Sequence, residues 1–150
     1  MRVRAKHTIF LVTLDVMFVL LLAGCRPHQQ SEVNDTNVFD WAQLVIENSS
    51  VTRDTESLNL IIVNNSPDTF VIGYEFWVEQ KEKSTWVVLP FKAGTRFRLR
   101  ARYVLQDSTS EFKVDLLLLK KPPRPGEYRI VIPAHRSEEK FFLVTLFTVT

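Results

Sequence analysis

From Phe39 onward the sequence is a succession of short segments rich in β-branched and aromatic residues, separated by clusters of turn-forming residues. Such segments are typical of β-strands, and we find no stretch between them with the 3.6-residue periodicity of an amphipathic helix. Eight short strands in about 110 residues are typical of a sandwich of antiparallel sheets. The predicted strands are residues 40–48, 57–64, 70–80, 85–90, 96–105, 111–118, 127–132 and 140–149.

The clearest period-2 alternation lies in residues 96–105. Apolar positions at Phe97, Leu99, Ala101, Tyr103 and Leu105 alternate there with Arg96, Arg98, Arg100 and Arg102. Successive side chains of a strand point to opposite faces, so the four guanidinium groups are expected to share one face, about 6.5–7 Å apart. Because guanidinium forks match phosphate geometry, this ridge is a candidate site for an anionic envelope polymer or phospholipid headgroups. The alternative is that the arginines pair with acidic residues of neighbouring strands, such as Glu75, Glu79 or Glu111.

The first 24 residues have the three regions of an export signal. Three basic residues precede an apolar run over residues 9–22, and small residues follow at positions 23 and 24. The run is shorter than the roughly 20 residues that cross a bilayer core, and Asp15 interrupts it. We therefore predict a signal peptide over residues 1–24 and no transmembrane helix there.

The segment Leu22-Ala23-Gly24-Cys25 resembles the lipobox of bacterial lipoproteins. In that family a diacylglyceryl group is joined to the cysteine thiol, and the signal peptidase cuts just before the cysteine. The resemblance implies that Cys25 is the lipidation site, and two acyl chains anchor a protein stably where one does so only marginally. It also implies an extracytoplasmic location on the cell membrane, or on the outer membrane if the cell is Gram-negative. An ordinary signal peptide followed by an incidental cysteine is the alternative.

Residues 25–38 are polar and almost without apolar side chains, so we expect a flexible tether that does not pack. Residues 39–150 then form the folded domain. Removing residues 1–24 from the 19 basic and 17 acidic residues leaves 16 of each, so the mature chain is neutral. A neutral chain lacks the excess positive charge of a general nucleic-acid binder, and no nucleic-acid partner is predicted.

Cys25 is the only cysteine, which excludes an intramolecular disulfide and a site of several cysteine ligands. The histidines at positions 7, 28 and 135 have no ligand-like spacing, so neither a metal nor a cofactor is predicted. His135, after Pro133, is expected in a solvated loop, and no nucleophile, histidine and carboxylate form a recognisable catalytic set. Asp54 with Glu56, or Asp107 with Glu111, could supply oxygens to calcium, although ordinary turn solvation is the simpler interpretation.

Several short motifs follow one another along residues 51–150. They are the run 58–66; Tyr74, Phe76, Val78 and Glu79; Trp86 with Leu89-Pro90; Phe112, Val114, Asp115 and Leu116; and Pro125-Gly126-Glu127-Tyr128-Arg129-Ile130. Together they resemble the bacterial Ig-like domains of lipoproteins and other extracytoplasmic proteins, chiefly of Gram-positive bacteria. The resemblance implies an immunoglobulin-like β-sandwich of seven to eight antiparallel strands, and it carries no catalytic or ligand residues.

Four further features have a structural and, in one case, a functional interpretation. Residues 64–68 are expected to form a turn, because Asn and Asp side chains bond to nearby backbone and Pro67 fixes one dihedral. Tyr128 is expected to be a tyrosine corner. Trp86 is expected to fill the sandwich core, whereas Trp77 could either pack or form a sugar-binding platform.

These observations predict a membrane-anchored, extracytoplasmic lipoprotein with a non-enzymatic binding or interaction domain. Its partners would be the membrane, through the lipid on Cys25, and an envelope protein or an anionic polymer or headgroup. The alternative is a structural or accessory subunit of an envelope membrane complex. A hydrolase is the weakest of the hypotheses, because the sequence has no catalytic constellation.

Overall fold

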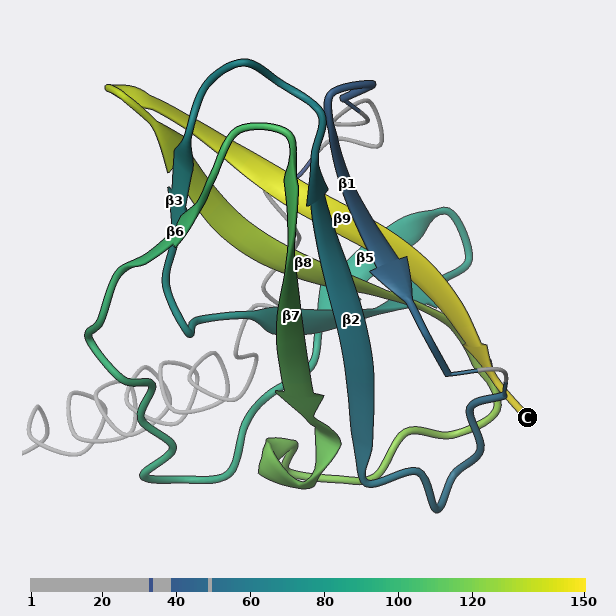
Figure 1. Cartoon of the computed structure of the whole chain (residues 1–150). Helices are drawn as coiled ribbons and strands as arrows, with labels where there is room; N and C mark the ends of the chain where they lie inside the picture. The colour runs from purple at the N-terminus through teal and green to yellow at the C-terminus, as the bar shows by residue number, and fades with distance from the viewer. Residues whose placement is uncertain (1–32, 34–38, 49) are drawn as a thin grey trace, which may run out of the picture.

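The computed structural model describes residues 33, 39–48 and 50–150 (Figure 1). The predicted signal peptide, Cys25 and most of the predicted tether lie outside the described residues. Nine strands and one 3-10 turn make up the regular structure of the described part. They are β1 (Ala42–Ile46), β2 (Ser57–Asn64), β3 (Phe70–Ile72), β4 (Trp77–Glu82), β5 (Thr85–Val88), β6 (Arg102–Val104), β7 (Ser108–Asp115), η2 (Leu116–Leu118), β8 (Gly126–Arg136) and β9 (Glu139–Val149). Among these residues there is no helix long and apolar enough to cross a membrane.

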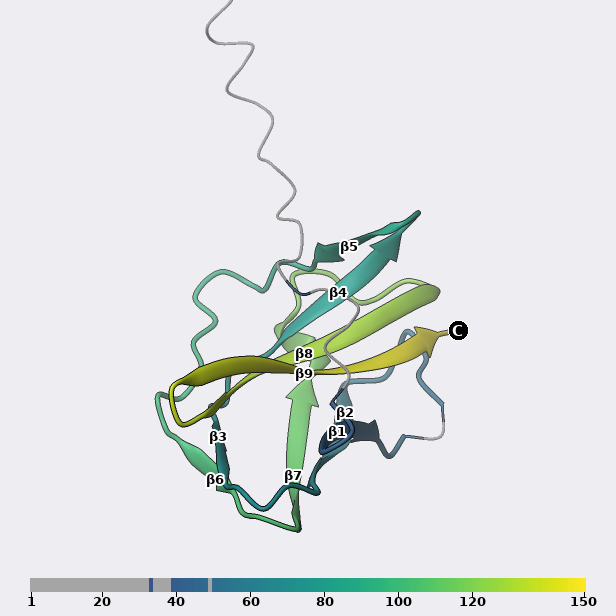
Figure 2. The ribbon, with the colours of Figure 1, turned by 90° about the horizontal axis from the view of Figure 1, so that it is seen from above.

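The strands form two antiparallel sheets that face each other (Figure 2). One sheet has three strands in the order β1-β2-β7, and the other has six, in the order β5-β4-β8-β3-β6 with β9 paired to β8. Both β3 and β4 pair with β8, with Ile72 opposite Ala134 and Trp77 opposite Val131. The predicted all-β sandwich is therefore confirmed.

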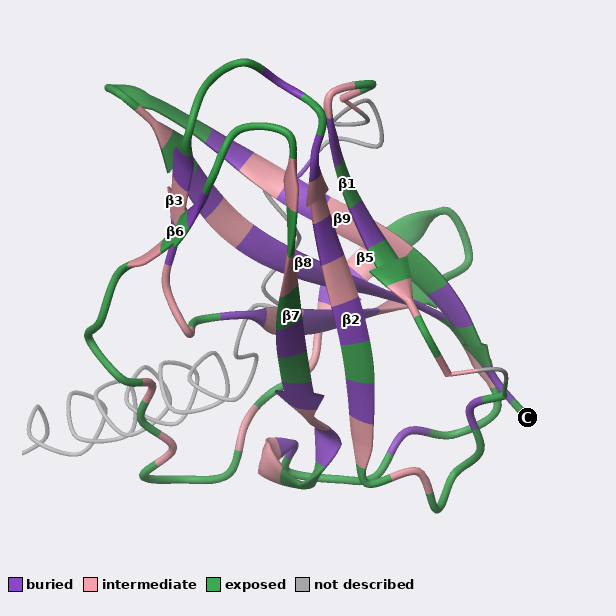
Figure 3. Ribbon diagram, in the orientation of Figure 1, coloured by how far each residue is buried: buried purple, intermediate pink, exposed green. Residues whose placement is uncertain are grey.

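The core lies between the two sheets and follows the period-2 alternation of the sequence. Buried and exposed positions alternate along much of β2 and β7, as Figure 3 shows. Leu58, Leu60 and Ile62 of β2 are fully buried, and so are Ile130 and Ile132 of β8. Because one side of each strand is apolar, stacking the two sheets removes both apolar faces from water together.

The structure corrects several predicted strand boundaries outside the arginine-rich segment, and the largest extension is that of strand 127–132, which becomes β8 (Gly126–Arg136). The predicted strand 70–80 is divided into β3 and β4, since residues 73–76 are not paired in the sheet. The predicted strand 111–118 begins earlier, at Ser108, and its last three residues form η2 instead. The Asp115 side chain accepts a hydrogen bond from the Leu117 amide at 2.9 Å, which caps this turn and ends the strand.

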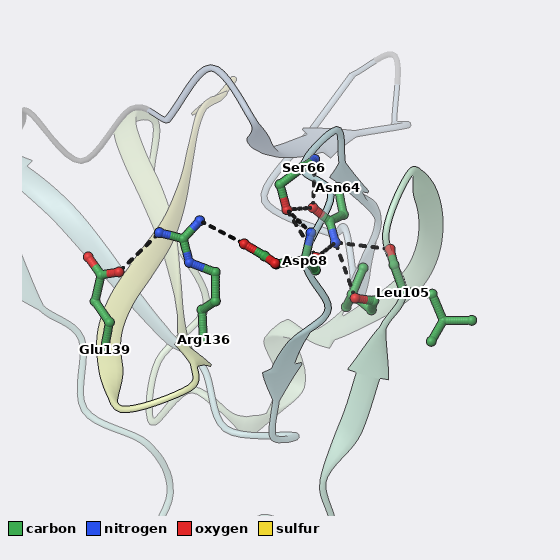
Figure 4. A network of polar contacts seen from close by, with 7 residues as sticks. Asn64, Ser66, Asp68, Leu105, Arg136 and Glu139 are labelled. Carbon is green, nitrogen blue, oxygen red and sulfur yellow. Dashed lines mark hydrogen bonds and ion pairs between the residues drawn. The ribbon is translucent and has the colours of Figure 1, made fainter.

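A buried polar network at the end of β2 confirms the turn predicted at residues 64–68 (Figure 4). Asn64 is fully buried, and its Nδ2 donates to the carbonyl oxygens of Asp68 at 2.8 Å and Leu105 at 2.9 Å. Its Oδ1 accepts from both the amide and the hydroxyl of Ser66, at 3.0 and 2.7 Å. One side chain thus joins the end of β2, the turn after it and the end of β6, which belongs to the other sheet.

We expect Asn64→Ala to lower the free energy of unfolding by about 2–3 kcal/mol, because the buried groups that bond to its side chain would lose their partners. Urea unfolding followed by tryptophan fluorescence measures the change. Asn65→Ala is the matched control, because Asn65 is exposed and bonds through its backbone amide to the Trp41 carbonyl. Equal stability of the two variants would contradict a structural role for the network.

Tyr128 has the geometry predicted for a tyrosine corner. Its side chain is almost completely buried, and its hydroxyl donates to the Arg124 carbonyl at 2.7 Å and accepts from the Arg124 amide at 3.0 Å. Its ring stacks on Phe147 of β9 at a centroid distance of 5.4 Å. Burial raises the pKa of the hydroxyl, so the neutral form that bonds to Arg124 is favoured.

Candidate functional site

The outer face of the six-stranded sheet, which points away from the three-stranded sheet, carries an unusual set of side chains. Along β8, Tyr128, Ile130 and Ile132 belong to the core, so the alternate positions Arg129 and Val131 belong to the outer face. Both are nevertheless buried, with 2% and 0% of their surface exposed. Other side chains must therefore cover the outer face at the middle of β8.

An ion pair and two tryptophans form this cover. Arg129 and Glu79 are register partners across β8 and β4, and the Arg129 Nε lies 2.5 Å from Glu79 Oε2. The indole Nε1 of Trp77 donates to the other carboxylate oxygen of Glu79 at 2.7 Å. The Arg129 guanidinium also lies 4.6 Å from the ring centroid of Trp86, a cation–π distance.

Val33, the one described residue of the predicted tether, also lies in this cluster. It is 5% exposed, and its carbonyl oxygen accepts a hydrogen bond of 2.8 Å from Nη2 of Arg129. The expectation that residues 25–38 do not pack is therefore wrong at Val33. The reason is that the buried Arg129 has donors beyond those that Glu79 accepts, and a backbone carbonyl satisfies one of them.

Both tryptophans lie on the outer face, which corrects the prediction for Trp86 and favours the packing alternative for Trp77. Trp86 does not fill the sandwich core as expected, since its register partner in β4 is Lys81, on the same outer face as Glu79. Trp77 is half-buried and packs edge-on against Phe142 of β9 at 5.6 Å. Trp77 thus covers the outer side of β9 at Phe142, whereas Leu146 farther along the strand is 67% exposed.

The predicted strand 96–105 is wrong over most of its length. Only Arg102–Val104 pair in the sheet, because the partner strand β3 contributes three residues and ends at Ile72. The preceding residues lie in the long connection between β5 and β6 (Figure 1). Phe97 anchors this connection, with its ring 5.2 Å from Phe76 and 5.4 Å from Phe91. The four arginines therefore do not form one ridge on a strand.

Arg102 is half-buried and points toward β7. Its Nη2 donates to the Ser110 hydroxyl at 3.0 Å and to the Glu111 carbonyl at 2.6 Å, so it connects β6 with β7 of the other sheet. The guanidinium also lies 5.6 Å from the ring of Tyr74. These contacts give Arg102 a structural role and remove it from the candidate anion site.

Arg98 and Arg100 instead line an open groove of about 470 Å³, which we call the basic groove. Its other walls come from the connection between β3 and β4 and from the outer faces of β8 and β9. Its charged lining residues are Arg98, Arg100, Lys140 and one carboxylate, Glu75, and His135 lines it as well. Among the described residues, no carboxylate forms an ion pair with the side chain of Arg98 or Arg100. Arg96 is exposed and does not line the groove.

Register explains why the groove contains residues that sequence reasoning missed. His135 of β8 pairs with Lys140 of β9 and with Val71 of β3, and Val71 pairs with Tyr103 of β6. These four residues form one row across the sheet, on the same side as the groove. His135 therefore lies in a strand and not in the loop that Pro133 suggested. A prediction of the β8–β9 hairpin register would have brought His135 and Lys140 together.

The other candidate sites find less support. A second groove of about 510 Å³ contains Arg102 and Lys113 together with Glu47 and Glu111, so its charges are mixed. Within the part of the chain that the structure describes, no group of three potential metal-ligating side chains is found. The calcium sites considered at Asp54 with Glu56 and at Asp107 with Glu111 thus have no third such ligand there.

Two facing antiparallel sheets around one core and a tyrosine corner are features of an immunoglobulin-like β-sandwich. The family model described as "Bacterial Ig-like domain" matches residues 40–141, and the chain belongs to this family. No curated protein matches the chain in sequence. Among solved structures, the chain is similar to a β-glucosidase involved in saponin metabolism from intestinal bacteria, with 14% identity and a TM-score of 0.37. That match covers 72% of this chain and 16% of the β-glucosidase, so this chain corresponds to a small part of that protein.

Proposed function

We propose that this protein is a lipid-anchored, extracytoplasmic interaction module that binds anionic groups in the basic groove and has no catalytic activity. The observation that carries the proposal is the open placement of Arg98 and Arg100, whose guanidinium groups have no carboxylate partner among the described residues. Membership of the bacterial Ig-like family supports an extracytoplasmic interaction domain. The lipobox-like segment ending at Cys25 supports the membrane anchor.

The electrostatics of the groove favour an anionic ligand. Arginine presents a planar fork of donors that can bond two oxygens of a phosphate or carboxylate at once, and Lys140 adds a compact positive charge. The mature chain is neutral overall, so Arg98, Arg100 and Lys140 give the groove a local excess of positive charge. A neutral domain with a basic groove is suited to a specific anionic contact and not to general binding of polyanions.

The charge-reversal variant Arg98→Glu/Arg100→Glu tests the proposal. We expect its affinity for immobilised heparin, used as a model polyanion, to fall by at least about tenfold, because each exposed charge pair contributes up to about 1 kcal/mol and reversal adds repulsion. The melting temperature should hardly change, since both side chains are exposed. The measurement is the salt concentration that elutes the mature protein in detergent.

Lys120→Glu/Lys121→Glu is the matched control, because it changes the net charge equally at two exposed positions that do not line the groove. If this control loses as much retention as the arginine variant, binding follows net charge and the groove is not the site. A wild-type protein that heparin does not retain at low salt would also contradict the proposal.

A further inference from the structure

The docking point of Val33 and the basic groove lie on the same face of the domain. Arg129, which holds the Val33 carbonyl, and His135, which lines the groove, both belong to the outer side of β8. Trp77 connects the two places, because it lines the groove and also donates to Glu79, the partner of Arg129. The three-stranded sheet lies on the opposite side of the sandwich (Figure 2).

The covalent chain limits how far this face can be from the predicted anchor. Val33 is eight residues after Cys25, and a fully extended chain spans at most about 3.6 Å per residue, or about 29 Å in total. If Cys25 carries the lipid, its attachment point is therefore within about 29 Å of Val33. A tether that ended at Phe39 would allow about 50 Å by the same rule. Docking at Val33 thus keeps the outer face near the bilayer.

The rim of the groove on this face carries exposed apolar side chains beside the basic ones. Leu99, between Arg98 and Arg100, is fully exposed to solvent, with a relative exposure of 105%. Tyr103 is 68% exposed, and its register with Val71 and His135 places it on the outer face. Arginine and tyrosine are side chains that combine an apolar body with a polar end, which suits the boundary between lipid and water.

We propose that the outer face of the six-stranded sheet lies against an anionic phospholipid surface, with Arg98 and Arg100 at the headgroups and Leu99 inserted between them. This inference rests on the proposed function, because it names the partner of the same groove. A free anionic polymer would explain the arginines but not a fully exposed leucine between them. A lipid surface accounts for both, and the Val33 contact brings the face to that surface.

The lipid anchor makes a weak contact sufficient. Each basic side chain near an anionic surface strengthens membrane binding by about fivefold, so Arg98, Arg100 and Lys140 together give roughly a hundredfold, too little to hold a free domain stably. In an anchored protein the same contact is intramolecular, and its high effective concentration favours the bound arrangement. The groove would then set the orientation of the domain on the membrane, while the lipid holds the protein there.

Fluorescent labelling of the lipid-anchored protein in vesicles tests this orientation. Cys25 is the only native cysteine and its thiol would carry the lipid, so an added cysteine is labelled specifically. An environment-sensitive dye is attached in Ala101→Cys, at the exposed wall of the groove, or in Thr109→Cys, on the outer side of β7. The vesicles contain phosphatidylcholine alone or mixed with phosphatidylglycerol, with spin-labelled lipid as the quencher.

We expect the dye at position 101 to shift to the blue and to be quenched in the anionic vesicles only, and the dye at position 109 to stay in water in both. When Arg98→Glu/Arg100→Glu is introduced into the labelled protein, the equilibrium constant for contact between the groove and the membrane should fall by at least about 25-fold, since each arginine contributes about fivefold. Leu99→Ser should weaken the membrane contact while leaving heparin retention unchanged. This difference separates a lipid surface from any soluble polyanion.

Two results would overturn the inference. If the dye at position 101 stays in water on anionic vesicles while the protein is retained on heparin, the groove binds a soluble anion and the proposed function stands without the membrane contact. If the dyes at positions 101 and 109 respond equally, the domain has no preferred face toward the bilayer. If the wild-type protein does not bind heparin at all, the proposed function itself is refuted.

Discussion

Arg129→Met is expected to lower the free energy of unfolding by about 3–5 kcal/mol, the usual cost of removing one partner of a buried ion pair. The variant would leave Glu79, which is 0% exposed, without its positive partner. It would also remove the cation–π contact with Trp86 and the donor to the Val33 carbonyl. Chemical unfolding in urea, with the slope of the transition compared between variants, measures the loss.

The double variant Glu79→Gln/Arg129→Met separates a buried unpaired charge from simple loss of packing. Glutamine keeps an oxygen that can accept from the Trp77 indole but carries no charge. Because neutral replacements of a buried ion pair often cost little, we expect the double variant to recover more than half of the stability that Arg129→Met loses. A double variant as unstable as the single one would show that packing around Arg129, and not the charge on Glu79, explains the effect.

This ion pair also has a consequence for the N-terminal segment. With Arg129 replaced, the Val33 carbonyl loses its donor, so a protease that cleaves within residues 26–38 should cut the folded variant faster than the wild-type protein. The Glu79–Arg129 pair therefore connects the stability of the sheet to the docking of Val33. A stability loss without faster cleavage would limit the role of Arg129 to the sheet.

The parts of the fold that follow from local patterns could be predicted from the sequence. The second half of β7 alternates between the polar residues Glu111, Lys113 and Asp115 and the apolar residues Phe112 and Val114, because one side of the strand faces the core. The turn after Asn64 and the corner at Tyr128 depend on hydrogen bonds between residues only a few positions apart. For these features the residue types themselves determine the geometry.

The features that depend on which strands pair could not be predicted in the same way. Residues 96–105 have the alternation of a strand, but most of them have no partner, since β3 is only three residues long. Trp86 is a large aromatic residue of the kind expected in a core, yet its position opposite Lys81 places it on the outer face. Glu79 and Arg129 are 50 residues apart in sequence, and only the pairing of β4 with β8 brings them together.

The candidate site shows the same division. Of the four arginines expected to act together, Arg98 and Arg100 line the basic groove, whereas Arg96 lies outside it and Arg102 stabilises the contact between the sheets. Arg98 and Arg100 are exposed because they are charged. The path of the chain around Phe97 separates them from Arg102. Lys140 and His135 line the groove together because they are register partners in β8 and β9, and no local motif predicts that register.

Cys25→Ser is expected to abolish membrane anchoring completely, because the thiol is the atom to which the lipid is attached and a serine hydroxyl does not replace it. The variant should accumulate as an uncut precursor that incorporates no radiolabelled palmitate and that lacks the mass of a diacylglyceryl group. None of the contacts described for the domain involves Cys25, so the β-sheet circular-dichroism spectrum should be unchanged. Ser31→Ala, in the same predicted tether, is the control and should be processed and lipidated as the wild-type protein is.

Finding the Cys25→Ser protein cut and held in the membrane as before would refute the lipoprotein hypothesis. That result would also remove the length limit that keeps the basic groove close to the bilayer. The contact of Arg98, Leu99 and Arg100 with lipid would then have to hold a free domain at the membrane. Roughly a hundredfold of electrostatic attraction is too weak for that.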